Sequence, residues 1–125
     1  MYVLDSSALI EIWENGLKKE KVLQIAGNEL SVTTSICAHE VLYGARSEKQ
    51  RFLLENLLAN IAVLQHDYRA ATIGARLEQE LDGLGLKIPR IDITIAAICI
   101  VHNAELVTLD QGFKRIKGLK VHVIR

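Results

Sequence analysis

Short apolar runs that alternate with segments of helical periodicity constrain the fold of this chain more than any other feature of its sequence. Such runs are typical of strands, and apolar residues that recur every three or four positions are typical of helices. The expected strands cover residues 2–4, 30–32, 61–64, 105–108 and 120–124. The expected helices cover residues 7–26, as one helix or two, and residues 33–46, 49–59, 67–81, 92–102 and 111–116. Alternating strands and helices form a parallel sheet, so we expect an α/β fold, a three-layer sandwich in which helices flank a central parallel sheet.

The helix expected over residues 67–81 has the clearest amphipathic pattern. Asp67 is a typical N-cap for it, and Thr33 or Thr34 has the same role at the start of an earlier helix. The inner stripe of this amphipathic helix contains Ala70, Ile73, Gly74, Leu77 and Leu81. Residues 92–102 are apolar nearly all round, which predicts a helix at the centre of the fold.

The chain has 125 residues, 50% of them hydrophobic, which is enough for one domain with a buried core. One proline and eight scattered glycines leave no linker-like stretch, so we expect a single domain over residues 1–125. Cys37 and Cys99 lie among apolar residues, which favours buried thiols over a disulfide or a reactive nucleophile. No group of Cys and His residues has the spacing of a zinc site.

Fifteen basic residues balance fifteen acidic ones, so the net charge gives no sign of a strong, sequence-independent binder of nucleic acid or membranes. A neutral sum does not exclude a local basic patch. The apolar stretch at residues 1–4 is too short for a signal peptide, and no apolar run has the length of a membrane span. We expect a soluble, cytoplasmic protein with no membrane association.

Four acidic residues fall where the expected fold would gather them. In open α/β sheets, ligands bind at the carboxyl ends of the strands. Asp5 directly follows the first expected strand, and Asp110 follows the strand over residues 105–108. Asp92 opens one expected helix and Glu40 lies inside another, and such helices begin at the edge where the preceding strand ends. We therefore expect the four carboxylates to converge on one edge of the sheet.

Each acid also has a purely structural interpretation. Asp92 has the position of a helix N-cap, and Asp110 precedes Gln-Gly as a turn residue would. Glu40 borders an apolar stripe, where a lone carboxylate is costly, but it is also compatible with a solvated flank. Asp5 carries the strongest signal, because an acid that closes an apolar N-terminal strand replaces burial with a charge.

Four ionised carboxylates at one edge require either protonation or bound cations. Two unit charges about 4 Å apart repel by roughly 4 kcal/mol at an effective dielectric constant near 20. Ligands that are all oxygen select Mg²⁺ or Mn²⁺ rather than zinc or copper. A pair of such ions held by carboxylates suits phosphodiester hydrolysis, in which one ion activates water and the other stabilises the leaving oxygen.

The four acids occur in the segments VLDSSAL at residues 3–9, AHEVLYG at 38–44, DITIAA at 92–97 and LVTLDQGF at 106–113. In this order and spacing the segments resemble the motifs of the PIN-domain family, and within it the VapC-like toxins of toxin–antitoxin pairs. The segment DYRAA at residues 67–71 is also similar to the helix start that precedes the family's third motif. The resemblance extends over the whole chain.

The resemblance implies a metal-dependent endoribonuclease that hydrolyses RNA, forms a homodimer and is inhibited by a small antitoxin. It makes Asp5 and Asp92 the central metal ligands, with Glu40 and Asp110 completing an acidic, catalytic site for Mg²⁺ or Mn²⁺. Ser7 and Thr108 would be supporting polar residues. Candidates for an RNA track, each also compatible with plain solvated surface, are Arg46, Lys49, Arg51, Lys87, Arg90, Lys114, Arg115 and Lys117.

A phospho-receiver domain is the main alternative of another class, because it also carries acids at strand ends. It requires an acid pair after the first strand and a lysine after the last, whereas Ser6 follows Asp5 and the last strand runs to Arg125. A haloacid-dehalogenase-like phosphatase requires a second aspartate where Ser7 stands. A catalytically silent PIN domain used only for binding is a third alternative.

The expected helix over residues 49–59 is apolar on more than one face, since Phe52, Leu53, Leu54, Leu57 and Leu58 follow one another closely. A surface helix over one core needs a single apolar face, so this pattern favours a two-fold dimer. The alternative is a helix buried within its own domain.

Overall fold

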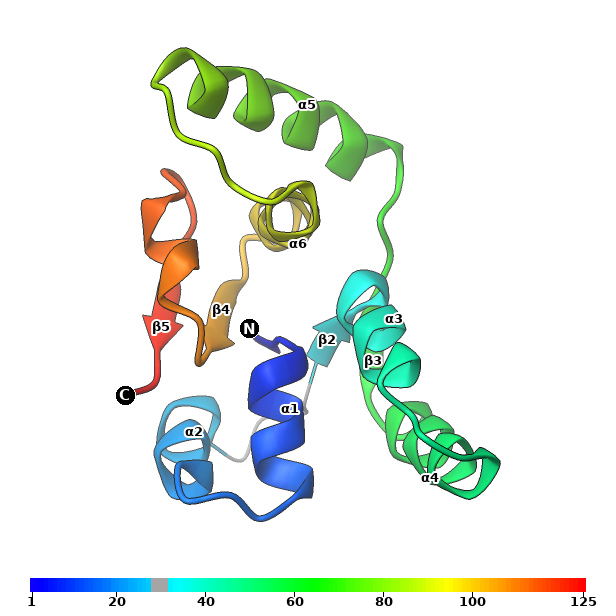
Figure 1. Cartoon of the computed structure of the whole chain (residues 1–125). Helices are drawn as coiled ribbons and strands as arrows, with labels where there is room; N and C mark the ends of the chain where they lie inside the picture. Colours follow the sequence, from blue (N-terminus) through cyan, green and yellow to red (C-terminus); the bar gives the residue numbers. More distant parts are fainter. Residues whose placement is uncertain (28–31) are drawn as a thin grey trace.

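The computed structural model describes residues 1–27 and 32–125, and the strands in these ranges form a five-stranded parallel sheet. The strands are β1 (Tyr2–Leu4), β2 (Val32–Thr34), β3 (Ala62–Leu64), β4 (Glu105–Thr108) and β5 (Val121–Val123). Their order in the sheet is β3-β2-β1-β4-β5 (Figure 1). Of the strand expected over residues 30–32, only Val32 belongs to the described residues, and it starts β2.

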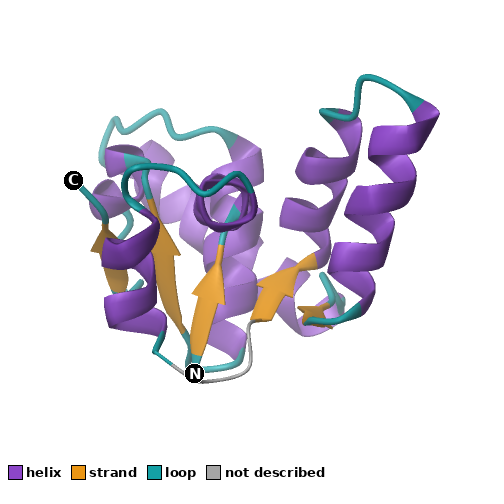
Figure 2. Ribbon diagram, turned by 90° about the horizontal axis from the view of Figure 1, so that it is seen from below, coloured by secondary structure: helices purple, strands orange, loops and turns teal. Residues whose placement is uncertain are grey.

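Helices flank this sheet on both faces, which confirms the expected α/β sandwich (Figures 1 and 2). They are α1 (Ser6–Trp13), α2 (Lys19–Ala26), α3 (Ser35–Tyr43), α4 (Glu48–Ala59), α5 (Tyr68–Gly83), α6 (Arg90–Val101) and the 3₁₀ helix η1 (Gln111–Arg115). Helices α5 and α6 cover one face, and α1 and α2 cover the other (Figure 1). None of the helices in the described part of the chain is long and apolar enough to span a membrane.

Alternation along the two central strands sends neighbouring side chains to opposite layers. Val3 and Leu106 pack with residues of α5 and α6, whereas Leu4 and Val107 pack with residues of α1 and α2. All four are at most 1% exposed. Successive strand residues point to opposite faces, so an apolar strand with both faces buried provides two half-cores at once. This is why consecutive apolar residues, Val3-Leu4 and Leu106-Val107, occur in β1 and β4.

Side-chain caps fix where several helices begin. Thr34 accepts a hydrogen bond from the Cys37 N–H at 3.0 Å, and Asp67 accepts one from the Ala70 N–H at 3.0 Å. Thr34 and Asp67 are therefore the N-caps, as predicted. The alternative cap Thr33 was wrong: it is a fully buried β2 residue whose hydroxyl donates to the Leu4 carbonyl at 2.7 Å.

The two cysteines are buried, free thiols, as predicted. Cys37 and Cys99 are both 0% exposed, and burial raises the pKa of Cys37 to about 11 and that of Cys99 to about 12. A thiol that stays protonated at neutral pH is a poor nucleophile. The cysteines thus serve as small apolar residues of the core.

The chain changes direction across the sheet between β1 and β4. From β1 the chain proceeds outward through β2 to β3. Helices α5 and α6 then form the connection that places β4 on the other side of β1. A switch of this kind opens a crevice at the carboxyl ends of the two strands, where ligands bind in open α/β folds. Asp5 and Asp110 follow these two strand ends.

Candidate functional site

Asp5 is a buried carboxylate that caps helix α1 at the end of β1. It is 4% exposed, and Oδ1 accepts hydrogen bonds from the Ser7 hydroxyl at 2.6 Å and the Ala8 N–H at 3.0 Å. Oδ2 accepts one from the Thr108 hydroxyl. Burial raises the pKa of Asp5, these three hydrogen bonds oppose the rise, and the charge of Asp110 adds to it. The capping role was missed in the sequence, although a strand followed by Asp and two serines is compatible with it.

Two hydroxyl groups connect Asp5 to the end of β4. The Ser7 oxygen accepts a hydrogen bond from the Leu109 N–H at 3.0 Å. The Thr108 oxygen accepts one from the Asp110 N–H, also at 3.0 Å. Each hydroxyl therefore donates to the carboxylate and accepts from the backbone that follows β4. The arrangement fixes the position of Asp5 relative to the segment that carries Asp110.

Asp110 is exposed and caps the 3₁₀ helix η1, because its Oδ1 accepts the Gly112 N–H at 2.8 Å. The local structural interpretation of this residue is thus correct. Its charge nevertheless raises the pKa of both Asp5 and Asp92. Capping and membership of the acidic group are compatible here.

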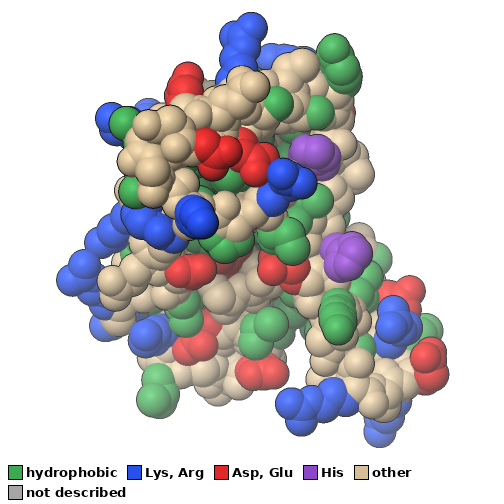
Figure 3. All heavy atoms as spheres, turned by 45° about the horizontal axis from the view of Figure 1, so that its top comes forward, with side chains coloured by type: hydrophobic (Ala, Val, Ile, Leu, Met, Phe, Trp, Pro, Cys, Tyr) green, Lys and Arg blue, Asp and Glu red, His purple; other side chains and the backbone are tan. Residues whose placement is uncertain are grey.

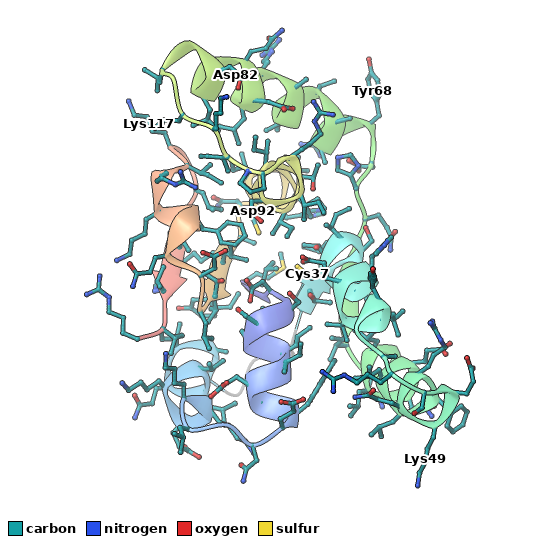
Figure 4. All side chains as sticks on the ribbon, viewed as in Figure 1. Cys37, Lys49, Tyr68, Asp82, Asp92 and Lys117 are labelled. Carbon is teal, nitrogen blue, oxygen red and sulfur yellow. The ribbon has the colours of Figure 1, made fainter. Side chains whose placement is uncertain are left out.

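Asp92 lies in the first turn of α6 and does not cap it. The helix begins at Arg90, after Pro89, and this end has no side-chain cap. The carboxylate lies on the side of α6 that faces α1 and β4 (Figure 4). Partial burial raises the pKa of Asp92 to about 6, with further contributions from the charges of the other three acids and opposition from Arg115. The N-cap interpretation of Asp92 was therefore wrong.

Glu40 is exposed, near the C-terminal end of α3. The Ser6 hydroxyl donates to its Oε1 at 3.4 Å, a long and weak hydrogen bond. Partial burial and the charge of Asp5 raise the pKa of Glu40, whereas Ser6 and His39 oppose the rise. Glu40 is solvated, as one interpretation of the sequence held, and it still lies within electrostatic reach of Asp5.

The four acids thus share one electrostatic environment at the switch between β1 and β4. As the side chains stand, no three His, Cys, Asp or Glu residues of the described ranges are grouped closely enough to hold one ion. Like charges repel, and both oxygens of Asp5 are engaged by hydrogen-bond donors. The donor set itself, all oxygen and partly desolvated, fits a hard divalent cation.

A groove of about 600 Å³ adjoins this acidic group. It is lined by His39, Glu40, Tyr43, Gly44 and Ile91. Apart from Glu40, none of these residues was singled out from the sequence as a site residue. Two signals were available: Tyr43 follows Glu40 by one helical turn, and Ile91 precedes Asp92.

Two of the basic residues considered for an RNA track are paired with glutamates. Arg90 is paired with Glu78 at 3.2 Å and Arg51 with Glu48 at 3.9 Å. Arg115, on η1, is the candidate whose charge reaches Asp92. In the face shown in Figure 3, acidic side chains are interspersed with basic and hydrophobic ones.

Comparisons with known proteins agree on one family. The sequence profile of the PIN domain matches residues 2–119. The fold is similar to the structure of VapBC2 from Rickettsia felis bound to a DNA fragment from its promoter, with a TM-score of 0.83, 25% identity and coverage of 99% of this chain and 98% of that one. The fold is also similar to VapBC-1 from nontypeable Haemophilus influenzae, with a TM-score of 0.80, 25% identity and coverage of 98% of this chain and 96% of that one. For DNA-bound VapBC from Salmonella typhimurium the TM-score is 0.82 and the identity 23%, with the same coverage of both chains. No curated protein matches the chain significantly.

Proposed function

The chain belongs to the PIN domain family, whose members are generally nucleases that use divalent metal ions, and we propose that it is a metal-dependent endoribonuclease acting as the toxin of a toxin–antitoxin pair. The observation that carries the proposal is the acidic group at the switch between β1 and β4. Burial and mutual repulsion raise the pKa values of three of its carboxyls, and such an accumulation of unfavourable charge is typical of a functional site.

In this proposal Asp5 and Asp92 are the central ligands of Mg²⁺ or Mn²⁺, and Glu40 and Asp110 complete the catalytic site. When bound, the metal would supply charge stabilisation for the phosphodiester and an activated water. Ser7 and Thr108 are positioning residues: their hydroxyl groups hold both oxygens of Asp5 at the end of β1. Rotation of the exposed Glu40 and Asp110 side chains toward the two less exposed acids would complete the set of ligands.

Near neutral pH the chain's own residues need only supply ionised carboxylates for the metal and a cation for the phosphate. Asp92, with a pKa of about 6, is mostly ionised at pH 7, and the hydrogen bonds to Asp5 favour its ionised form. Arg115 is the cation near Asp92 and would contact a phosphate of the strand. Because Arg51 and Arg90 are paired with glutamates, we expect the chain to bind a short stretch of single-stranded RNA rather than a long duplex.

Protein partners belong to the same proposal. Helix α4 exposes Phe52 (69%) and Leu53 (57%), which supports a protein interface. We assign this face to the two-fold dimer that the sequence predicts. We propose an antitoxin as the second partner, since a similar structure, VapBC-5 from Mycobacterium tuberculosis, is a member of the VapBC family of toxin–antitoxin systems. The active unit would be one nuclease domain over residues 1–125, working in the cytoplasm where its RNA substrate and antitoxin are made.

The test is cleavage of a labelled single-stranded RNA in Mg²⁺ or Mn²⁺, with and without chelator. Wild type should cut only with metal, and Asp92→Asn should lose nearly all activity because a charged ligand is removed while the shape is kept. Asp82→Asn is the matched control, an exposed aspartate near the end of α5 and remote from Asp92 (Figure 4). Full activity of Asp92→Asn, or of wild type in chelator, would overturn the proposed site.

The same assay decides between the remaining alternatives. The family assignment replaces the phospho-receiver alternative. A catalytically silent PIN domain would bind RNA or a protein partner and leave RNA intact at every metal concentration. Parallel reactions with DNA of the same sequence test the choice of RNA as the substrate.

A further inference from the structure

The groove beside Glu40 exposes two large apolar side chains where the acidic site meets solvent. Tyr43 is 75% exposed and Ile91 is 51% exposed. Exposed apolar residues scattered singly need no explanation, but these two line one groove of about 600 Å³. That volume lies in the range of small-ligand sites.

The groove is continuous with the proposed nuclease site through both of its walls. On α3, Tyr43 is three positions after Glu40, so the two side chains lie on neighbouring parts of one helix face. On α6, Ile91 immediately precedes Asp92. The groove therefore begins at the acids and leads away from them between two helices that contact each other.

The lining chemistry favours a flat, uncharged ring over an anion. Among the described residues no Lys or Arg lines this groove, and Glu40 would repel an acidic peptide there. Arg51 lines an adjoining pocket that shares His39 and Tyr43. The one close aromatic pair in residues 1–27 and 32–125 is Tyr2 with His122, so the Tyr43 ring has no aromatic partner. Nucleobases stack on such rings whatever their identity, and His39 can exchange hydrogen bonds with a base edge.

We propose that Tyr43 is a stacking platform that, with His39 and Ile91, receives a nucleobase of single-stranded RNA. This base is next to the nucleotide whose phosphate reaches the metal that the carboxylates would hold. This assignment rests on the proposed function and specifies how that site positions its substrate. A strand whose phosphate lies at the metal that the acids would hold brings an adjacent base within one nucleotide of the groove. Stacking supplies affinity that does not depend on basic residues.

The experiment uses a short single-stranded RNA carrying one 2-aminopurine, whose fluorescence is quenched by stacking, mixed with the full chain in Mg²⁺ and followed from the moment of mixing. Wild type and Tyr43→Phe should quench the probe, because both keep an aromatic ring. Tyr43→Ala should not quench it and should raise the KM for cleavage roughly tenfold or more, with kcat much less affected. The control is Tyr68→Ala, an 83% exposed tyrosine that points away from the site and should behave as wild type (Figure 4).

Each result decides something different. Quenching by Tyr43→Ala equal to wild type overturns the stacking platform, as does a wild type that never quenches. A Tyr43→Ala protein that becomes monomeric in light scattering, with an unchanged RNA response, shows that a second copy of the chain covers the groove instead. Quenching by wild type without any strand cleavage would contradict the proposed nuclease activity and would still support base binding in the groove.

Discussion

The hydroxyl of Thr108 donates a hydrogen bond to the carboxylate of Asp5 and so joins the ends of β4 and β1, the two strands between which the sheet changes direction. Thr108 is fully buried and Asp5 nearly so. A buried carboxylate needs donors to remain ionised, and Thr108 is one of three that Asp5 has. The proposed metal ligand is thus held in place by the fold itself.

Thr108→Val should destabilise the metal-free protein by about 1–3 kcal/mol, because the shape is kept while a buried acceptor loses its donor. The pKa of Asp5 should rise further, so metal affinity near neutral pH should fall. Urea unfolding in chelator measures the first effect. Thr72→Val, at an exposed position of α5, is the control, and equal stability of the two variants would contradict a structural role for the Thr108–Asp5 bond.

Asp110→Asn should raise the melting temperature of the metal-free protein by roughly a few degrees at low salt. Asn caps a helix about as well as Asp, so the bond to the Gly112 N–H survives while the repulsion of Asp5 and Asp92 is removed. Thermal melts in chelator test this. A lower melting temperature would mean that Asp110 stabilises the fold through its charge and does not crowd the other acids.

Mn²⁺ at about a hundred times its Kd should stabilise wild type by roughly 2.7 kcal/mol, which is several degrees or more for a domain of this size. Asp92→Asn should gain much less, because it lacks a charged ligand, whereas Asp82→Asn should gain as much as wild type. Melts of the three proteins with chelator and with Mn²⁺ provide the comparison. Identical gains in all three would exclude Asp92 as a ligand.

The stability of the metal-free protein should depend on pH through Asp92. Its pKa in the fold, about 6, lies above the ordinary value of 3.8, so folding favours the protonated form. The unfolded chain releases this proton first, and stability therefore falls as pH rises from about 4 to about 6. The melting temperature of wild type, compared with that of Asp92→Asn, should fall across this pH window and the difference should stay constant above it. A flat difference would show that the Asp92 carboxyl is not perturbed.

Metal binding should show the opposite dependence on pH, because the cation must displace the proton of Asp92. The stabilisation by Mn²⁺ should shrink as pH falls below about 6.

Substituting both Phe52→Ser and Leu53→Ser should weaken self-association without unfolding the chain, because both side chains are more than half exposed. Light scattering at micromolar concentration should then give a monomer, whereas wild type gives a dimer. A wild-type monomer would remove the basis for the dimer. An unchanged dimer in the double variant would leave this face of α4 for the antitoxin.

The sequence by itself determined the elements and the edge at which the acids stand. The strand over residues 105–108 and the Asp67 cap follow from patterns within one or two turns of chain, and both were predicted correctly. A parallel α/β sheet has one carboxyl edge, so the strand ends alone placed Asp5 and Asp110 together. Leu30 and Ser31, of the strand expected over residues 30–32, lie outside the described residues.

Only the tertiary structure decided the environment of each acid. Asp5 is buried against Thr108, more than a hundred residues away in sequence, because the crossover through α5 and α6 places β4 beside β1. Asp92 does not cap α6 because this helix starts at Arg90. Its pKa is raised first by burial and then by carboxylates on three other elements. The groove at Tyr43 exists because α3 and α6 meet. Burial, hydrogen-bond partners and charge at short range depend on which distant segments become neighbours, and local sequence patterns do not contain that information.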